Sequence, residues 1–201
     1  MSLIDQINII RYHKERIQNY PDYHKQLGWK GKKSQILRFE ALIEGLDLNY
    51  SSVLDVGCGY ADFKTFLDTQ FNLVSYTGIE LVPEFVNEAA LRFICDRFAS
   101  FIHGDFSTAL LTEIDYVFCC GALCYKNSDP EYPFKMIRKM YYTSRKGSAF
   151  CMLDSQLFPE HPVLTGFCKK EVVKYCRSIA DKVIVNDNYL LEDFSVKMIH
   201  R

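Results

Sequence analysis

The chain has 201 residues, of which 48% are hydrophobic and 24% charged, and its formal net charge is -1. This composition is typical of one folded domain with a full core and gives no indication of disorder. No block of Lys and Arg stands out, so the sequence does not favour a nucleic-acid partner. Because no apolar run can span a bilayer and the first residues lack the order of a signal peptide, we expect a cytoplasmic protein without a membrane partner.

The first 50 residues are predicted to be helical, with no strand. Apolar residues recur at helical spacing over residues 3–18 and predict an amphipathic helix. Its apolar side consists of Leu3, Ile7, Ile10 and Ile17. A loop that holds Trp29 follows, and a second helix, capped by Ser34, is predicted to end at Gly45. These elements would form an N-terminal cap, residues 1–50.

From Val53 the pattern changes to alternating strands and helices, which predicts βαβ units. Strands are expected at 52–58, 74–81, 99–103, 114–120, 148–153, 182–185 and 194–199. A helix over residues 129–144 is predicted to be ended by Gly147, and another covers 169–180. The last two strands have no helix between them and should be antiparallel. The predicted fold is α/β: a Rossmann-like three-layer αβα sandwich whose seven-stranded, mostly parallel sheet ends in an antiparallel C-terminal hairpin.

The eight cysteines are interpreted as buried thiols, because most lie within apolar runs. Cys119, Cys120 and Cys124 are close in sequence, but no Cys-x-x-Cys pair or nearby His accompanies them. We therefore expect no metal site. Cys58 is interpreted as a small filler, since nothing near it in sequence would lower a thiol pKa.

The first strand turns sharply into a helix through Gly57 and Gly59. Without side chains, these glycines let a ligand approach the main chain, and the helix that follows offers unpaired N–H groups. Asp55 lies at the carboxyl end of the strand, where ligands bind in open α/β sheets. Such turns also occur with nothing bound, so the pattern alone leaves the ligand open.

Four motifs along residues 50–201 resemble those of class I S-adenosylmethionine-dependent methyltransferases, in the family's order. They are Val53-Leu54-Asp55-Val56-Gly57-Cys58-Gly59, Tyr76-Thr77-Gly78-Ile79-Glu80-Leu81, Phe101-Ile102-His103-Gly104-Asp105-Phe106 and Asp115-Tyr116-Val117-Phe118-Cys119-Cys120-Gly121-Ala122. The N-terminal cap, with Leu27-Gly28-Trp29, more loosely resembles a poorly characterised bacterial subgroup of this superfamily. The resemblance implies that residues 51–201 bind S-adenosyl-L-methionine as the methyl donor. The cofactor product would be S-adenosyl-L-homocysteine.

The resemblance also implies roles for individual residues. Glu80 would accept the ribose hydroxyls and Asp105 the adenine amino group, with Phe106 beside the base; ordinary strand-end acids are the alternative. The expected cofactor-binding residues are Trp29, Arg38, Asp55, Gly57, Cys58, Gly59, Asp62, Glu80, Leu81, Asp105, Phe106, Cys120 and Gly121. Arg38 and Gln35 lie one helical turn apart and can reach a carboxylate, or form a solvated helix face.

Two departures from known motifs limit the class of reaction that we expect. Ala61 and Asp62 replace the third glycine of a dinucleotide fingerprint, which argues against a nicotinamide-dependent oxidoreductase. The fourth strand lacks the Asn/Asp-Pro-Pro-Tyr signature, which argues against DNA adenine and glutamine as acceptors. We expect in-line methyl transfer to an oxygen, nitrogen or carbon of a small molecule. A non-catalytic, regulatory S-adenosylmethionine-binding protein remains the alternative.

A general base is useful for an oxygen or nitrogen acceptor but not obligatory. The candidates near the expected site are His161 and Tyr125, followed by His24 and Tyr20, although a surface or packing role is open for each. Trp29 could close over the site together with Tyr20 and Tyr23, or serve only as a hydrophobic packing residue. The oligomeric state is not predicted.

Overall fold

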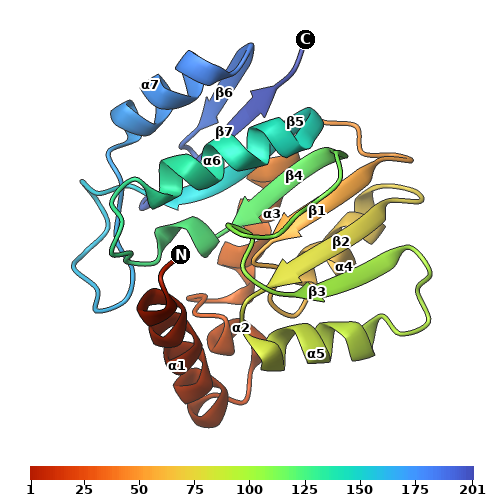
Figure 1. Cartoon of the computed structure of the whole chain (residues 1–201), viewed down its shortest axis with the longest axis vertical. Coiled ribbons are helices and arrows are strands. Elements are labelled where there is room, and N and C mark those ends of the chain that lie inside the picture. The colour runs from red at the N-terminus through yellow and green to blue at the C-terminus, as the bar shows by residue number, and fades with distance from the viewer.

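The protein is a seven-stranded sheet with helices on both faces, as Figure 1 shows for the computed structural model, which describes residues 1–201. The strands are β1 (Ser52–Val56), β2 (Ser75–Glu80), β3 (Ala99–His103), β4 (Ile114–Cys120), β5 (Ser144–Leu153), β6 (Lys182–Asn186) and β7 (Asp193–Ile199). Their order in the sheet is β3-β2-β1-β4-β5-β7-β6. The first five strands pair in parallel, while β7 is antiparallel to both β5 and β6. The predicted fold class, including the antiparallel C-terminal hairpin, is confirmed.

The helices form two layers and a cover. They are α1 (Leu3–Asn19), α2 (Tyr23–Gln26), α3 (Lys32–Ile43), α4 (Asp62–Gln70), α5 (Pro83–Arg92), α6 (Tyr132–Thr143) and α7 (Lys169–Ile179), with a 3-10 turn η1 (Ala122–Cys124) after β4. One core cluster joins α3 and α4 to the sheet through Leu42 and Phe63, and the other joins α6 and α7 through Ile137 and Val172. None of these helices has the length and hydropathy to cross a membrane.

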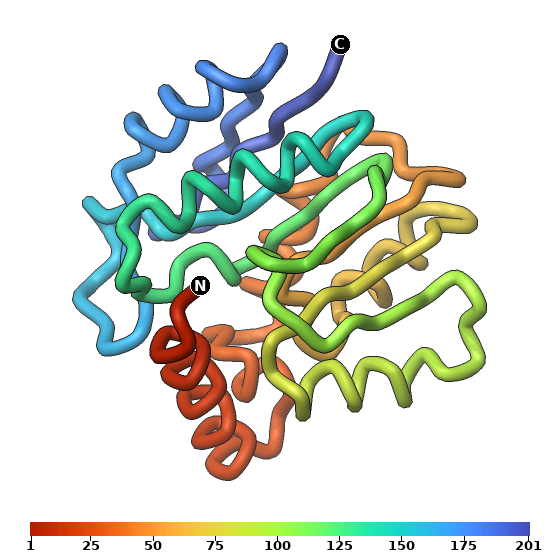
Figure 2. Tube along the Cα trace, viewed as in Figure 1, coloured from red at the N-terminus to blue at the C-terminus, as the bar shows by residue number.

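Helix α1 lies across the carboxyl ends of the strands, with its first residue beside the segment that follows β4 (Figure 2). Its contacts with loops at that edge include two hydrogen bonds: Ser128 Oγ donates to Asp5 at 2.7 Å, and Gln6 donates to Asp105 at 3.2 Å. The predicted helix is confirmed, but only part of its apolar stripe is packed: Ile10 and Ile17 lie against the core cluster of Tyr60, Val82 and Phe85. Leu3 is 71% exposed and Ile7 44% exposed, whereas Asp5, Ile9 and His13 are buried.

Two predicted boundaries were wrong. Helix α6 ends at Thr143 and β5 begins at the next residue, so Gly147 lies inside the sheet instead of ending the helix. A side chain there would place a Cβ 2.7 Å from the Met198 carbonyl, so glycine serves the close approach of β7. Ser34 does not cap α3, whose N-cap is Gly31; the Ser34 hydroxyl donates back to the Gly31 carbonyl at 2.8 Å.

Candidate functional site

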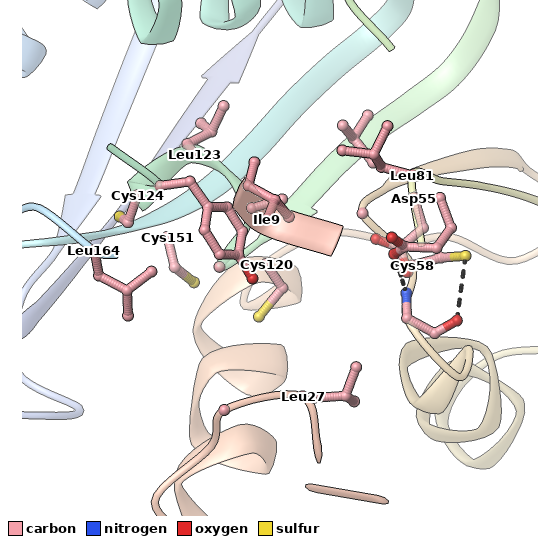
Figure 3. A pocket seen from close by; sticks show the side chains of 18 of the residues that line it. Ile9, Leu27, Asp55, Cys58, Leu81, Cys120, Leu123, Cys124, Cys151 and Leu164 are labelled. Atoms are coloured by element: carbon pink, nitrogen blue, oxygen red, sulfur yellow. Dashed lines mark hydrogen bonds between the residues drawn. The ribbon is translucent and has the colours of Figure 1, made fainter. Parts of the chain in front are cut away.

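A cavity of about 200 Å³ lies at the carboxyl ends of the central strands, and 25 of its 40 lining residues are hydrophobic. In Figure 3, Asp55, Cys58 and Leu81 lie on one side, Leu123, Cys124, Cys151 and Leu164 lie on the other, and Ile9 lies between. All the residues expected to contact the cofactor line this cavity: Trp29, Arg38, Asp55, Gly57, Cys58, Gly59, Asp62, Glu80, Leu81, Asp105, Phe106, Cys120 and Gly121. The sheet therefore gathers the four motifs around one space.

The glycine turn after β1 has the backbone that its sequence predicts. Gly57 and Gly59 have φ of 74° and 55°, in the left-handed region that side chains disfavour. A Cβ on Gly57 would lie 2.5 Å from the Cβ of Ala122, so this glycine also allows the turn to pass close to η1. Ala61 has a φ of 60°, so the third position keeps a conformation suited to glycine although an alanine stands there.

Glu80, at the end of β2, stabilises this turn through hydrogen bonds to its carboxylate. It is 7% exposed, and its two carboxylate oxygens accept from the backbone N–H of Gly59 and of Val82, each at 2.8 Å. Burial raises the pKa of Glu80, while these N–H donors oppose the rise. Because an ionised carboxylate has about four lone-pair directions, two remain for hydroxyl groups of a ligand.

Asp55 is the second buried acid beside the turn. It is 2% exposed, and its carboxyl accepts from the Tyr76 hydroxyl at 2.6 Å. Burial raises the pKa of Asp55 to about 7 despite that hydrogen bond. A cationic group in the cavity would therefore favour its ionised form.

Asp105, after β3, is covered by the N-terminal segment. Its Oδ2 atom lies 3.3 Å from the Met1 amino group and accepts from the Gln6 side chain. The next loop is fixed by Lys139 of α6, whose ammonium donates to the carbonyls of Phe106 at 2.6 Å and Ala109 at 2.7 Å. The acid and the aromatic ring beside it are thus positioned by elements distant in sequence.

Trp29 and Arg38 form the wall nearest β7. The Arg38 side chain pairs with Asp193 through two hydrogen bonds, donates to the Ser34 carbonyl at 2.9 Å and lies 4.9 Å from the Trp29 ring centre. The indole N–H of Trp29 is buried without an acceptor, so a donor at the cavity wall is unpaired. Gln35, on the same helix, donates to Asp62 at 3.0 Å.

Three thiols of the cavity, those of Cys58, Cys120 and Cys124, are protonated side chains. Burial raises the pKa of Cys58 and of Cys120 well above the ordinary value, and that of Cys124 to about 12. These residues therefore act as small uncharged groups, as predicted for Cys58, and leave room beside the backbone.

Of the predicted general bases, Tyr125 lines the cavity and His161 does not. His161 Nδ1 accepts from the backbone N–H of Val163 and of Leu164, at 3.2 and 3.0 Å, so this imidazole caps a turn. Three further aromatic candidates, His24, Tyr20 and Tyr23, also lie outside the lining; Tyr23 stacks on Tyr60 and donates to Glu88.

His13 is the residue that the sequence interpretation missed. It is buried in α1, lines the cavity, and places Nε2 2.5 Å from the Tyr125 hydroxyl oxygen and Nδ1 3.1 Å from the Gln26 carbonyl oxygen. Burial lowers the pKa of His13 to about 4. A signal exists in the spacing of Asp5, Ile9 and His13, which share one helical face at steps of four residues.

Comparisons with known proteins find similarity to methyltransferases. Residues 53–147 match the family described as "Methyltransferase domain". The Mycobacterium tuberculosis protein Rv1506c, whose name assigns it provisionally to the methyltransferases, is 29% identical in an alignment of 160 positions that covers 72% of this chain and 90% of that protein.

Solved structures share the fold over nearly the whole chain. Magnesium protoporphyrin IX methyltransferase from Synechocystis PCC 6803, with bound S-adenosylhomocysteine, has a TM-score of 0.69 at 14% identity and covers 98% of this chain and 100% of its own. An N-methyltransferase of Bradyrhizobium japonicum WM9, also in complex with S-adenosylhomocysteine, has a TM-score of 0.67 at 14% identity and covers 98% of each chain. Residues 53–147 thus match a methyltransferase domain, and the chain shares its fold with these methyltransferases, as its four motifs predict.

Proposed function

We propose that the protein transfers a methyl group from S-adenosylmethionine to an oxygen, nitrogen or carbon atom of a small molecule by in-line displacement. The observation that carries this proposal is the convergence of Glu80, Asp105 and the Gly57–Gly59 turn on one cavity. Displacement at a sulfonium requires chiefly that donor and acceptor be held in line, and positioning alone supplies several kcal/mol, on the order of 7 or more.

The cofactor's adenosine would lie along β2 and β3. The two free lone-pair directions of Glu80 suit the vicinal ribose hydroxyls, because the other two already hold the turn. Asp105 would take the adenine amino group, with the buried Phe106 ring beside the base. Gln6 is one of the present donors to Asp105, and its amide would yield to the base or share this carboxylate with it.

The methionine end would lie between the glycine turn and α3. Arg38 has five N–H donors and uses three of them on Asp193 and Ser34, which leaves two for a carboxylate. The unpaired indole N–H of Trp29 is a further donor on this wall. Asp55, with a carboxyl that titrates near neutral pH, would accept the ammonium group.

The acceptor would occupy the apolar side of the cavity, between α1 and η1. The hydrophobic majority of the lining and the net charge of -1 favour a small molecule over nucleic acid. We propose residues 1–50 as the cap of this domain, with α1 and α2 over the cavity and α3 in the core layer. A cytoplasmic location is part of the same proposal, and cell fractionation would test it.

Incubation with S-adenosylmethionine labelled on its methyl group tests the activity. Transfer of label to a member of a small-molecule library supports the proposal. Calorimetry of the same preparation separates two contrary outcomes: cofactor binding without transfer to any compound would indicate a regulatory protein, and no binding would overturn the cofactor assignment itself.

A further inference from the structure

The cavity wall holds a buried series of hydrogen bonds that the proposed cofactor contacts do not include. It runs from the Gln26 carbonyl through the His13 ring to the Tyr125 hydroxyl. His13 is 3% exposed and its ring packs edge to face on Phe85, with the centroids 4.9 Å apart. The neighbouring helices α1 and α2 thus meet the distant residue after η1 and fix its hydroxyl group at the cavity wall.

The donor and the acceptor of each of these hydrogen bonds follow from the chemistry of the groups. A carbonyl oxygen only accepts, so Nδ1 of His13 carries the hydrogen and donates to Gln26. Nε2 of the neutral ring then has a free lone pair and accepts from the Tyr125 hydroxyl. Burial lowers the pKa of His13 and raises that of Tyr125, so both groups are uncharged near neutral pH. The lone pairs of the Tyr125 oxygen remain for a donor in the cavity.

The surroundings of Tyr125 are apolar. The lining on this side includes Ile9, Leu27, Leu123 and Leu164. The backbone of Tyr125 forms a bridge with Leu164, and Figure 3 shows Leu123 and Leu164 away from Asp55 and Cys58. A molecule with an apolar body and one polar group fits this side, with the polar group at Tyr125.

We propose that Tyr125 and His13 form a proton relay for the methyl acceptor, and that the acceptor is a neutral hydroxyl, phenolic or alcoholic, on an apolar body. The inference deepens the proposed function and rests on it. Tyr125 is the catalytic residue that touches the acceptor. His13 is a positioning residue, since it acts through the Tyr125 hydroxyl.

The step balances in atoms and charge. A lone pair of the acceptor oxygen forms a bond to the methyl carbon, and the breaking C–S bond returns its electron pair to sulfur, which becomes a neutral thioether. The acceptor proton passes to the Tyr125 oxygen while the Tyr125 proton passes to Nε2 of His13. One positive charge thus moves from the sulfonium to the imidazolium, which later releases its proton to water.

The weak basicity of His13 discriminates between acceptors. An oxonium that has just been methylated is a far stronger acid than imidazolium, so a ring with a pKa of about 4 accepts its proton readily. An aliphatic amine is an ammonium near neutral pH, with a pKa of about 10, and this ring cannot deprotonate it. A carboxylate has no proton to lose and would not need the relay.

Three probes with one aromatic body test the inference: 2-naphthol, 2-naphthoic acid and 2-naphthylmethylamine, each with methyl-labelled S-adenosylmethionine. Octanol serves as an alkyl hydroxyl probe. We expect transfer to a hydroxylated probe. Tyr125→Phe and His13→Gln should each lower kcat for it by about 10²-fold with S-adenosylhomocysteine affinity unchanged, and His13→Gln should also leave KM unchanged. His24→Gln and Tyr20→Phe, which lie outside the cavity, are the matched controls.

Wild-type kcat in a folded Tyr125→Phe variant would overturn the relay, and this variant decides the matter if His13→Gln does not fold. Protein that binds S-adenosylhomocysteine but methylates no hydroxylated probe would overturn the acceptor class and leave the proposed methyltransferase function standing. Protein that does not bind S-adenosylhomocysteine would overturn the proposed function instead.

Discussion

Asp55 places a carboxyl group that titrates near neutral pH at the cavity wall. In the free protein it is largely protonated below its pKa of about 7, whereas an ammonium group of a ligand favours the carboxylate. S-adenosylhomocysteine should therefore bind more tightly as pH rises, by up to about tenfold per unit below pH 7. Calorimetry at about pH 6 and about pH 8 checks this. Asp55→Asn should remove the dependence; a variant that keeps the wild-type dependence would exclude Asp55 as its source.

His13 makes the stability of the fold depend on pH. Its pKa is about 4 when folded and near 6.5 when unfolded, so the unfolded chain binds more protons between these values and stability rises with pH there. The charged or titratable groups around its ring are Arg16, Tyr12 and Tyr125.

We expect His13 to lower the free energy of unfolding by about 2 kcal/mol between about pH 7 and about pH 5. Urea unfolding of the wild type and of His13→Gln at both pH values measures this contribution. The two proteins should lose stability unequally, and parallel losses would mean that His13 is not the group responsible.

Residue identities at the site were predictable where a motif and its spacing carry them. Glu80 ends an apolar strand and Asp105 follows one, each at the position that the methyltransferase motifs give to an acid. Both residues line the cavity. His13 was missed because its partner Tyr125 lies 112 residues away and because its other partner is a backbone carbonyl, which no residue type reveals. His161 was favoured for its place in a loop, yet its ring serves the local turn.

At the scale of elements, α6 controls the loop that follows β3. Lys139 of α6 donates to three carbonyls of that loop, those of Phe106, Ser107 and Ala109. Without the ammonium these carbonyls lose charged donors, and the position of the adjacent acid, Asp105, becomes less defined.

We therefore expect Lys139→Met to weaken S-adenosylhomocysteine binding by about tenfold, the equivalent of about 1.4 kcal/mol. Lys135→Met is the matched control on the same helix, because Lys135 is exposed and pairs with Asp129. Calorimetric titration of both variants compares them. Equal affinities would show that the loop is held without Lys139.

The types of the helices and strands were predictable from periodicity. The buried face of α1 and the end of α6 were not. The apolar stripe of α1 predicted the helix correctly, while the buried side is the one that meets the polar ends of the strands through Asp5 and His13. Gly147 suggested a helix stop, but the close approach of β7 explains this glycine. Such features depend on neighbours that local patterns do not contain.

For the whole molecule, alternation of strands and helices predicts the fold class because parallel strands need a long crossover, usually a helix, and the short connection between the last two strands leaves them antiparallel. The same topology places the carboxyl ends of β1, β2 and β4 together, and hence the cavity. Closure by α1 depends on contacts such as Asp5 with Ser128 and Gln6 with Asp105, which only the folded chain reveals.

We propose that this cavity binds the cofactor through Glu80, the acid at the end of β2. Calorimetric titration of S-adenosylhomocysteine into the wild type, Glu80→Ala and Glu113→Ala tests it, with Glu113 an exposed glutamate in the segment between β3 and β4. We predict saturable binding to the wild type and to Glu113→Ala, and a loss of at least about tenfold in Glu80→Ala, since two acceptor directions for the ribose disappear. Wild-type affinity in a folded Glu80→Ala variant would contradict the account.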